Sequence, residues 1–213
     1  MHNFRTIIFD LAEVIIAGLV NVEPELGRIF GVPPETVANT IRGEIMDDYC
    51  RGRMTEDEYW RRTMARGGWP DRVDQAKAAV RRNFHSPVPG TEAIIRELAG
   101  TKSYRVCLLS DHGREWIDYI LPLHPVLGLL DRRFFSFDLG AIKRERVSFE
   151  RVLAELQAEP GECVFIDDNQ QNVEVARSVG ITPILFTGAP ALRADLARLG
   201  IPIVCETRDA TST

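Results

Sequence analysis

The stretch Cys163–Phe186, CVFIDDNQQNVEVARSVGITPILF, contains the local pattern that decides the fold. Its continuously apolar runs, Cys163–Ile166 and Pro183–Phe186, are typical of strands that are buried on both faces of a parallel sheet. Between them, Asn172–Ser178 has apolar residues at helical spacing, and Gly180 is a natural helix stop. A strand, a helix and a second strand in this order predict a right-handed crossover in an α/β sheet.

Further apolar runs extend the same pattern toward the N-terminus. Strands are predicted at Thr6–Phe9, Tyr104–Leu109 and Phe134–Phe137. Helices are predicted at Thr91–Ala99, where Thr91 is a candidate N-cap, and at Val147–Leu156. The predicted fold class is therefore α/β, with a doubly wound parallel sheet.

Residues 17–87 differ from this pattern, because they contain no convincing strand. Helices are predicted there at Glu25–Phe30, Pro34–Arg42, Thr55–Ala65 and Asp74–Phe84. Thr55 and Glu58 form a capping-box pattern at the start of one of them. We therefore predict an α/β core at residues 1–16 and 88–205, a small inserted helical cap at 17–87, and a polar tail at 206–213.

The composition excludes several classes of partner. Among 213 residues, 26 Lys and Arg face 31 Asp and Glu, so that the formal net charge is −5. Such a chain has no general attraction for nucleic-acid phosphates, and its apolar runs are shorter than the roughly 20 residues of a membrane span, so neither partner is expected. The four cysteines lack metal-ligand spacing, which disfavours zinc and favours a reducing, cytoplasmic location. No oligomeric state is predicted.

Acidic residues directly follow three of the predicted strands. Asp10 follows the first strand, Ser110 and Asp111 follow the second, and Asp167 and Asp168 follow the fourth. Because ligands bind beyond the carboxyl ends of parallel strands, these side chains are expected to converge. Clustered carboxylates repel each other unless a cation lies among them, and hard oxygen ligands suit Mg²⁺. One such aspartate alone is more often a turn former or helix cap, so the prediction depends on the three strand ends together.

Lys143 is a further candidate, because lysine is rare in this chain. Lys77, Lys102 and Lys143 are its lysines, and the other 23 basic residues are arginines. A lysine supplies a compact point charge where an arginine supplies a planar fork. A surface lysine without a function is the alternative that this count leaves open.

In their order and spacing, Asp10, Ser110, Lys143 and the Asp167–Asp168 pair resemble the four motifs of the haloacid dehalogenase (HAD) superfamily. FDLAEV (9–14) is similar to the first motif and LLSD (108–111) to the second. FIDDNQQNVEVARSVGITPILF (165–186) is similar to the fourth motif with its following helix and strand, and is the most specific match. The resemblance covers nearly the whole chain and includes a cap like that of the family's small phosphatases.

The resemblance implies a HAD-like hydrolase with a Rossmann-like core and, more specifically, a Mg²⁺-dependent phosphatase of a small phosphorylated metabolite. Asp10 would be the nucleophile and form an aspartyl-phosphate. The groups that would hold the phosphoryl oxygens are Ser110, Asp111 and Lys143. The implied metal ligands are Asp10, the backbone carbonyl of Ala12, Asp167 and Asp168. The cap would exclude solvent and select the leaving group.

Ala12 departs from the family pattern, because family phosphatases usually carry a second aspartate at this position. That aspartate serves as general acid and base, a role that typically contributes about 10²–10⁴-fold. His112 is a candidate to replace it, since imidazole titrates in the right range, and a loop histidine is the alternative. Glu13 is expected to face away from the site and to bond locally. A polar cluster in the cap either faces the substrate or forms a solvated helix face; its members are Asp47, Asp48 and Arg51.

Two other classes of function stay open at this point. A hydrolase of another bond would be either a phosphonate hydrolase, which needs a cap lysine such as Lys77 for a Schiff base, or a carbon–halogen hydrolase, which needs no metal. A non-catalytic ligand-binding protein is the second class, and Ala12 motivates it. Arg144, where proline commonly follows the lysine, and Asp111, where asparagine is common, are lesser departures.

Overall fold

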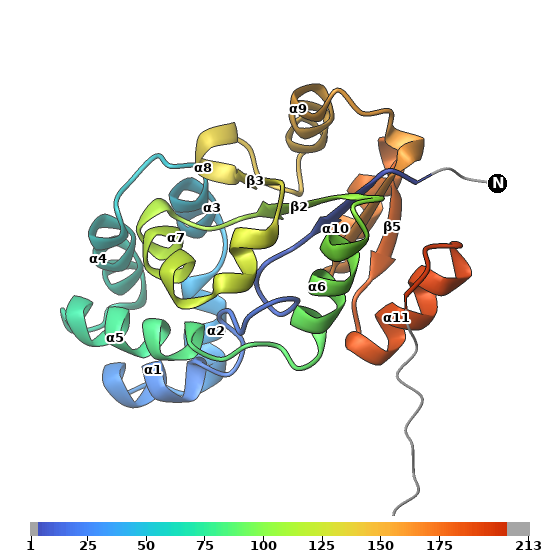
Figure 1. Ribbon diagram of the computed structural model, residues 1–213. Helices are drawn as coiled ribbons and strands as arrows, with labels where there is room; N and C mark the ends of the chain where they lie inside the picture. The colour runs from blue at the N-terminus through green and yellow to red at the C-terminus, as the bar shows by residue number, and fades with distance from the viewer. Residues whose placement is uncertain (1–3, 204–213) are drawn as a thin grey trace, which may run out of the picture.

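A computed structural model of the chain describes residues 4–203, and Figure 1 shows its arrangement. A five-stranded sheet lies at its centre, with every neighbouring pair parallel and the strands in the order β3-β2-β1-β4-β5. The strands are β1 (Thr6–Phe9), β2 (Arg105–Ser110), β3 (Arg132–Phe135), β4 (Cys163–Asp167) and β5 (Thr182–Leu185). Because the chain moves outward from β1 in both directions, the sheet is doubly wound, and the predicted fold class is confirmed.

Helices cover both faces of this sheet, because successive strand residues point to opposite sides. The helices after residue 90 are α6 (Thr91–Thr101), α7 (Arg114–Ile120), α8 (Ser136–Leu139), α9 (Arg146–Leu156), α10 (Gln170–Ser178) and α11 (Ala189–Arg198). Ile8 of β1 belongs to an apolar cluster with residues of α9 and α10. Its neighbour Ile7 belongs to a cluster on the other face with residues of α6 and α11. The buried, unpaired thiols of Cys107 and Cys163 belong to the first cluster as small apolar groups.

Between β1 and α6 the described chain forms five helices and no strand. These are α1 (Glu23–Phe30), α2 (Pro34–Ile41), α3 (Glu44–Cys50), α4 (Glu56–Gly67) and α5 (Val73–Phe84). They form a group beside the sheet, coloured blue to green in Figure 1. The Thr55 side chain accepts a hydrogen bond from the Glu58 N–H at the start of α4, as the capping-box pattern predicts. The α1–α5 segment is called the cap below.

Two antiparallel linkers join the cap to the sheet. The Ala17 N–H donates to the Ser86 carbonyl at 2.8 Å, and the Val88 N–H donates to the Ile15 carbonyl at 2.9 Å. The chain therefore enters and leaves the cap at one neck, close to the predicted boundaries at 16/17 and 87/88. The division of the chain into two domains stays a prediction, because one continuous apolar cluster extends from the sheet into the cap helices.

Some local predictions are wrong, for identifiable reasons. The strand predicted at Phe134–Phe137 ends at Phe135, because Ser136 already begins α8. Thr91 is the first residue of α6 rather than its cap: Gly90, with φ +84°, precedes the helix. Helices α3, α7 and α11 have no counterpart among the predictions. Short 3₁₀ turns also occur, at Leu121–Leu123, Pro125–Leu129 and Pro160–Glu162.

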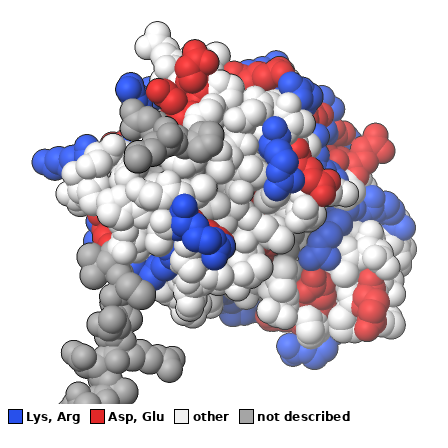
Figure 2. All heavy atoms as spheres, turned by 90° about the vertical axis from the view of Figure 1, so that its right-hand side faces the viewer, with Lys and Arg blue, Asp and Glu red and all other residues white. Residues whose placement is uncertain are grey.

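The surface is mixed in charge on the face that Figure 2 shows, where basic and acidic side chains are interspersed among uncharged ones. Within the described residues, no helix is long and apolar enough to cross a bilayer. The predicted polar tail at 206–213 lies outside the described residues.

Candidate active site

The carboxyl ends of β1 and β4 bring three carboxylates together. Asp10 follows β1, Asp167 is the last residue of β4, and Asp168 follows it. Phe9 lies opposite Ile166 in the sheet, so the two strands end at the same level. One carboxylate oxygen of each aspartate lies within 4.8 Å of the other two. The predicted convergence of these residues is thus present in the structure.

Burial makes this cluster unfavourable without a cation. It raises the pKa of Asp10 well above its ordinary value; the Lys143 ammonium opposes this shift, and the Asp167 charge adds to it. Burial and the Asp167 charge likewise raise the pKa of Asp168 to about 6. Negative charge is therefore destabilised at two of the three carboxylates, and a positive charge placed among them would stabilise it.

Lys143 supplies one such charge. Its Nζ lies 2.6 Å from Asp10 Oδ1 and 2.7 Å from Asp167 Oδ2, and its side chain is buried. Burial alone would lower the pKa of Lys143, but Asp10 and Asp167 raise it above its ordinary value. The ammonium therefore stays charged and bridges two of the three carboxylates.

Two asparagines that the sequence analysis missed hold Asp167 in place. The Asn172 side-chain amide donates to both carboxylate oxygens at 3.1 Å, and the backbone N–H of Asn169 donates to Oδ1 at 2.8 Å. The Asn169 side chain also caps α10 by accepting from the Gln171 N–H. The spacing could have indicated Asn172, because it lies five residues after Asp167, on the first turn of the helix that follows the strand.

Ser110, the last residue of β2, and His112, in the loop that follows, form a buried pair. Ser110 Oγ lies 2.6 Å from His112 Nδ1, and both residues are buried. His112 packs against the edges of Phe84 and Trp116. Burial, together with the Lys143 ammonium, lowers the pKa of His112 to about 3, so the ring is neutral near pH 7. The predicted phosphate-binding hydroxyl therefore already has an imidazole partner.

Asp111 supports the loop that carries Lys143. Its two carboxylate oxygens lie 3.2 and 3.0 Å from the backbone nitrogen of Lys143, which donates to them. Burial raises the pKa of Asp111 to about 6, against the opposing effect of the Lys143 charge. The observed contact is with the backbone of the lysine loop, and phosphate binding by Asp111 stays a prediction.

Glu13 is bonded locally, as the sequence analysis expects. Its Oε1 accepts hydrogen bonds from the backbone N–H groups of Gly18 at 2.9 Å and Val20 at 3.1 Å. Its backbone has φ +59°, a strained conformation for a residue with a side chain. Ala12 and Glu13 both line the cavity described below, so Glu13 does not face away from it.

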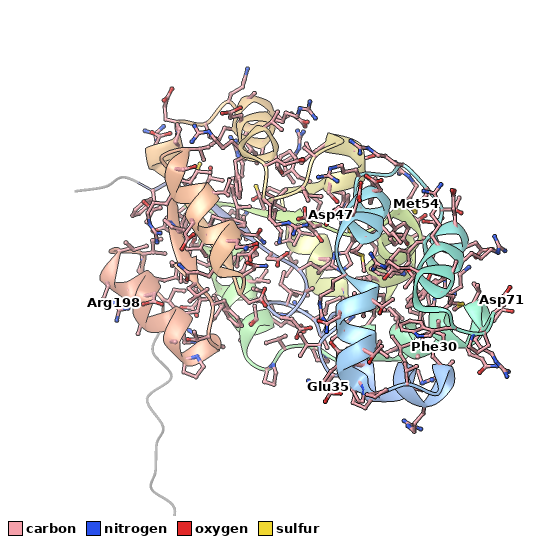
Figure 3. All side chains as sticks on the ribbon, turned by 180° about the vertical axis from the view of Figure 1, so that it is seen from behind. Phe30, Glu35, Asp47, Met54, Asp71 and Arg198 are labelled. Carbon is pink, nitrogen blue, oxygen red and sulfur yellow. The ribbon has the colours of Figure 1, made fainter. Side chains whose placement is uncertain are left out.

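In the polar cluster of the cap, Asp47 and Arg51 pair with residues of the core, whereas Asp48 pairs within the cap. Asp47 of α3 forms an ion pair with Arg144, and Figure 3 shows Asp47 on the side of α3 toward the sheet. Arg51 Nη2 lies 2.7 Å from Glu145 Oε1. Asp48 pairs with Arg53 at 2.7 Å. The two residues that follow Lys143 in the chain, Arg144 and Glu145, are thus ion-paired to α3 and to its C-cap residue.

Lys77, on which a Schiff-base mechanism would depend, does not line this cavity. It lies on α5 and forms an ion pair with Asp57 of α4, and its Nζ is 3.9 Å from Glu56. This position disfavours the phosphonate alternative.

A cavity of about 280 Å³ lies between the strand ends and the cap. From the strand ends it is lined by Asp10, Ala12, Asp111, His112, Lys143, Asp168 and Asn172; from the cap and the loop before it, by Leu19, Val20, Arg42, Met46, Asp47 and Cys50. Ser110 is not among the described residues that line it. A larger depression, of about 710 Å³, lies near the opposite ends of the strands and includes none of the predicted site residues.

The residues at the strand ends fit a divalent cation. Opposite ligands of a Mg²⁺ octahedron lie about 4.2 Å apart, so carboxylate oxygens within 4.8 Å need only small movements to share one ion. All three candidate ligands are oxygens, which Mg²⁺ prefers. Asp10, Asp167 and Asp168 would hold it, and the role of the Ala12 carbonyl stays a prediction.

A parallel sheet that presents acidic residues and one buried lysine beyond its strand ends, next to an inserted helical cap, defines a Rossmann-like hydrolase. The model of the haloacid dehalogenase-like hydrolase family matches residues 4–180. The chain belongs to this family, which confirms the resemblance.

Two curated relatives match this chain over most of their own length, at low sequence identity. The chain is 23% identical over 197 residues to flavin mononucleotide hydrolase 1 of Arabidopsis thaliana, covering 92% of this chain and 78% of that protein. It is 22% identical over 196 residues to the sesquiterpene phosphatase astK of Aspergillus oryzae, covering 92% and 96%.

Solved structures share the fold. A HAD-like family hydrolase from Porphyromonas gingivalis superposes with a TM-score of 0.77 at 22% identity, covering 94% of this chain and all of that chain. A HAD family enzyme from Bacteroides thetaiotaomicron, in complex with magnesium and inorganic phosphate, has a TM-score of 0.68 at 20% identity, covering 87% and 95%.

Proposed function

We propose that this hydrolase is a Mg²⁺-dependent phosphatase of a small phosphorylated metabolite, acting through an aspartyl-phosphate on Asp10. One observation carries the proposal: the carboxylates of Asp10, Asp167 and Asp168 lie within 4.8 Å of one another, with the Lys143 ammonium bonded to two of them. A phosphate dianion that approaches the Asp10 carboxylate meets electrostatic repulsion. In this buried site, the Lys143 ammonium and a bound Mg²⁺ would both offset that repulsion.

In the proposed reaction, Asp10 provides the attacking oxygen. A carboxylate oxygen of Asp10 forms a bond to phosphorus while the bond to the leaving-group oxygen breaks, and the leaving oxygen takes up a proton. Water then attacks phosphorus and loses a proton, and the bond to Asp10 breaks to release inorganic phosphate. Lys143 and the Ser110 hydroxyl hold the phosphoryl oxygens during both steps. A bound Mg²⁺ would neutralise charge and orient the phosphoryl group.

His112 is our candidate for the proton transfers in place of the missing aspartate. The ring lines the cavity with Asp10 and Ala12, and its Nδ1 is paired with Ser110, which leaves Nε2 for a ligand. The neutral ring accepts a proton from the attacking water. A phosphate dianion bound at Lys143 would oppose the effect of that lysine and favour the imidazolium that protonates the leaving group.

The relatives support this reading of the site. One is named a sesquiterpene phosphatase, and a structural neighbour was solved with magnesium and inorganic phosphate. A variant of that neighbour, in which an aspartate is replaced by alanine, was also solved with magnesium and inorganic phosphate. Binding of both ligands is thus compatible with loss of an aspartate in that enzyme.

The test is hydrolysis of a panel of phosphate esters, including p-nitrophenyl phosphate, by metal-loaded protein. We expect turnover with Mg²⁺, loss of turnover in EDTA, and a loss of at least about 10³-fold in Asp10→Asn. The matched control is Asp138→Asn, since Asp138 is exposed and does not line the cavity; this variant should retain wild-type activity.

The other functions make different predictions. Release of halide from a halogenated substrate in EDTA, without hydrolysis of phosphate esters, would favour a metal-free carbon–halogen hydrolase. Mg²⁺-dependent binding of phosphate esters without turnover would favour a non-catalytic ligand-binding protein, for which Ala12 is the motivating feature. Turnover that Asp10→Asn leaves intact would overturn the aspartyl-phosphate.

A further inference from the structure

The cap side of the cavity is apolar where a leaving group would lie. Leu19 and Val20, in the loop that leads into the cap, and Met46 on α3 line it there, with Trp116 and Ile142 as adjoining apolar walls. Val20 is 44% exposed and is one of the few large apolar side chains in the described chain that are exposed. Because Val20 adjoins Leu19 and Met46 in the lining, these side chains form one apolar surface within the cavity, and such contiguous surfaces are typical of ligand-binding sites.

The loop that presents these side chains is held by its backbone. Glu13 Oε1 accepts from the N–H groups of Gly18 and Val20, at 2.9 and 3.1 Å. Asn83 Nδ2, from the last cap helix, donates to the carbonyls of Gly18 and Val20, at 2.6 and 3.1 Å. Four hydrogen bonds therefore fix the two residues that flank Leu19, and Val20 stays exposed in a defined position.

The same loop lies directly against Ala12. A Cβ added at Gly18 would be 2.6 Å from the Ala12 Cβ and 3.1 Å from Glu13 Oε1, so residue 18 has no room for a side chain. The glycine at residue 18 therefore allows the Gly18–Val20 loop to lie against Ala12 at the base of the cavity.

The polar side chains on this side already have partners within the protein. Arg42 donates to Glu23 at 2.8 Å and to the Ala38 carbonyl at 3.2 Å. Asp47 and Arg144 pair with each other. A hydroxylated leaving group would compete with these contacts for the same side chains, whereas an apolar one would cover Leu19, Val20 and Met46 and leave them intact.

We propose that the substrate is a phosphomonoester with an apolar leaving group, a hydrocarbon or aryl chain, seated on Leu19, Val20 and Met46. This inference rests on the proposed phosphatase function for the position of the phosphoryl group. The phosphate would lie at Lys143 and the strand-end carboxylates, and the carbon chain would extend toward the Gly18–Val20 loop.

The first test compares esters of matched size in the presence of Mg²⁺. We expect kcat/KM to rise about threefold to fourfold for each methylene from ethyl to butyl phosphate, the increment for burying one CH₂. Propyl phosphate should exceed glycerol 3-phosphate at least tenfold. Equal values, or a preference for glycerol 3-phosphate, would overturn the apolar leaving group while leaving the phosphatase function intact.

Val20→Thr tests the apolar surface of the cavity, because threonine keeps the shape of valine but replaces one methyl group with a hydroxyl. It should lower kcat/KM for butyl phosphate about threefold to tenfold and leave methyl phosphate unchanged. The matched control is Val147→Thr, since Val147 is an exposed valine on α9 that does not line the cavity. This variant should leave kcat/KM unchanged for both butyl and methyl phosphate. An unchanged ratio of butyl to methyl phosphate in Val20→Thr would contradict the proposed seat.

Binding of phosphonates, which are not hydrolysed, tests the apolar leaving-group site independently of the proposed reaction. Calorimetry with ethyl- and butylphosphonate in Mg²⁺ should give a lower Kd for the butyl compound, and 2,3-dihydroxypropylphosphonate should bind at least tenfold more weakly than propylphosphonate. If no ester is hydrolysed but the phosphonates bind in this order of affinity, the apolar binding site is supported and the phosphatase function is contradicted. If the phosphonates do not bind in this order, the apolar binding site is contradicted, whether or not the esters are hydrolysed.

Discussion

The two sides of the cavity are built in opposite ways. At the strand ends, Asp10, Lys143 and Asp167 are buried, charged and bonded to one another. On the cap side, Leu19 and Val20 are apolar, and hydrogen bonds from the side chains of Glu13 and Asn83 hold the backbone of Gly18 and Val20. Under the proposed function, the strand ends would supply the charges for the reaction, and the cap side would supply the apolar surface that contacts the leaving group. Variants on each side should therefore affect different measurements.

The largest effect on stability is expected at the strand ends. Lys143→Met removes the charge that bridges Asp10 and Asp167 and leaves uncompensated buried carboxylates, which should cost about 3–5 kcal/mol in the free energy of unfolding. Denaturant unfolding in EDTA measures this loss. Added Mg²⁺ should restore more stability in this variant than in wild type, because a divalent cation replaces the missing charge.

Lys102→Met is the matched control for the lysine change. Lys102 is exposed and lies away from the carboxylates, so its loss should change stability by less than about 0.5 kcal/mol. An equal response of Lys143→Met and wild type to Mg²⁺ would argue against a cation site at the three carboxylates.

His112→Asn tests proton transfer on the same side of the cavity. Asparagine retains a polar group near the position of Nδ1, for Ser110, but lacks Nε2. For alkyl phosphates, whose leaving groups need a proton, kcat/KM should fall about 10²-fold. For p-nitrophenyl phosphate, whose leaving group departs as an anion, it should fall less than tenfold.

Ser110→Ala provides the comparison for that result. It removes the hydroxyl that, in the proposed reaction, holds the phosphoryl oxygens, so it should lower kcat/KM for both kinds of ester by a similar factor. If His112→Asn also lowers both equally, His112 positions Ser110 and does not transfer the proton.

An intermediate effect is expected from Asp111→Asn. Folding raises the pKa of Asp111 from 3.8 to about 6, so between these values the folded state binds more protons than the unfolded state. The stability contribution of this group therefore falls as pH rises from about 4 to 6. Asparagine can still accept from the Lys143 N–H without the buried charge, so the variant should gain up to about 3 kcal/mol above pH 6.

Thermal unfolding at several pH values measures how the stability difference between Asp111→Asn and wild type changes with pH. The difference between Asp111→Asn and wild type should be largest above pH 6 and should vanish near pH 4. A variant that is less stable than wild type at pH 7 would indicate that the Asp111 charge itself is needed to hold the lysine loop.

The smallest effect is expected from the ion pairs between cap and core. Asp47→Asn removes the partner of Arg144; because both side chains are partly exposed, the stability change should be within about 1 kcal/mol. KM should change by less than about fivefold, and the change should shrink in high salt. Asp138→Asn, which breaks an exposed pair with Arg114, is the control and should leave KM unchanged.

Much of the fold could be predicted from local sequence. The apolar run Thr6–Phe9 coincides with β1, and Cys163–Ile166 lies within β4, because strands buried on both faces are continuously apolar. The helix α3 was missed, since its seven residues, EIMDDYC, include only a short apolar pattern. It packs through the buried Tyr49, which contacts the rings of Tyr59 and Trp116, and Trp116 is far away in the sequence.

The sequence by itself determined which chemical groups lie at the carboxyl ends of the strands, because a residue that directly follows a parallel strand has few other places to go. Asp10, Asp167 and Asp168 could therefore be named as a cluster in advance. Only the tertiary structure decided what surrounds them: that His112 pairs with Ser110, that Asp111 holds the Lys143 backbone, and that Gly18 lies against Ala12. These contacts join segments whose approach depends on packing between elements, and no local pattern encodes that packing.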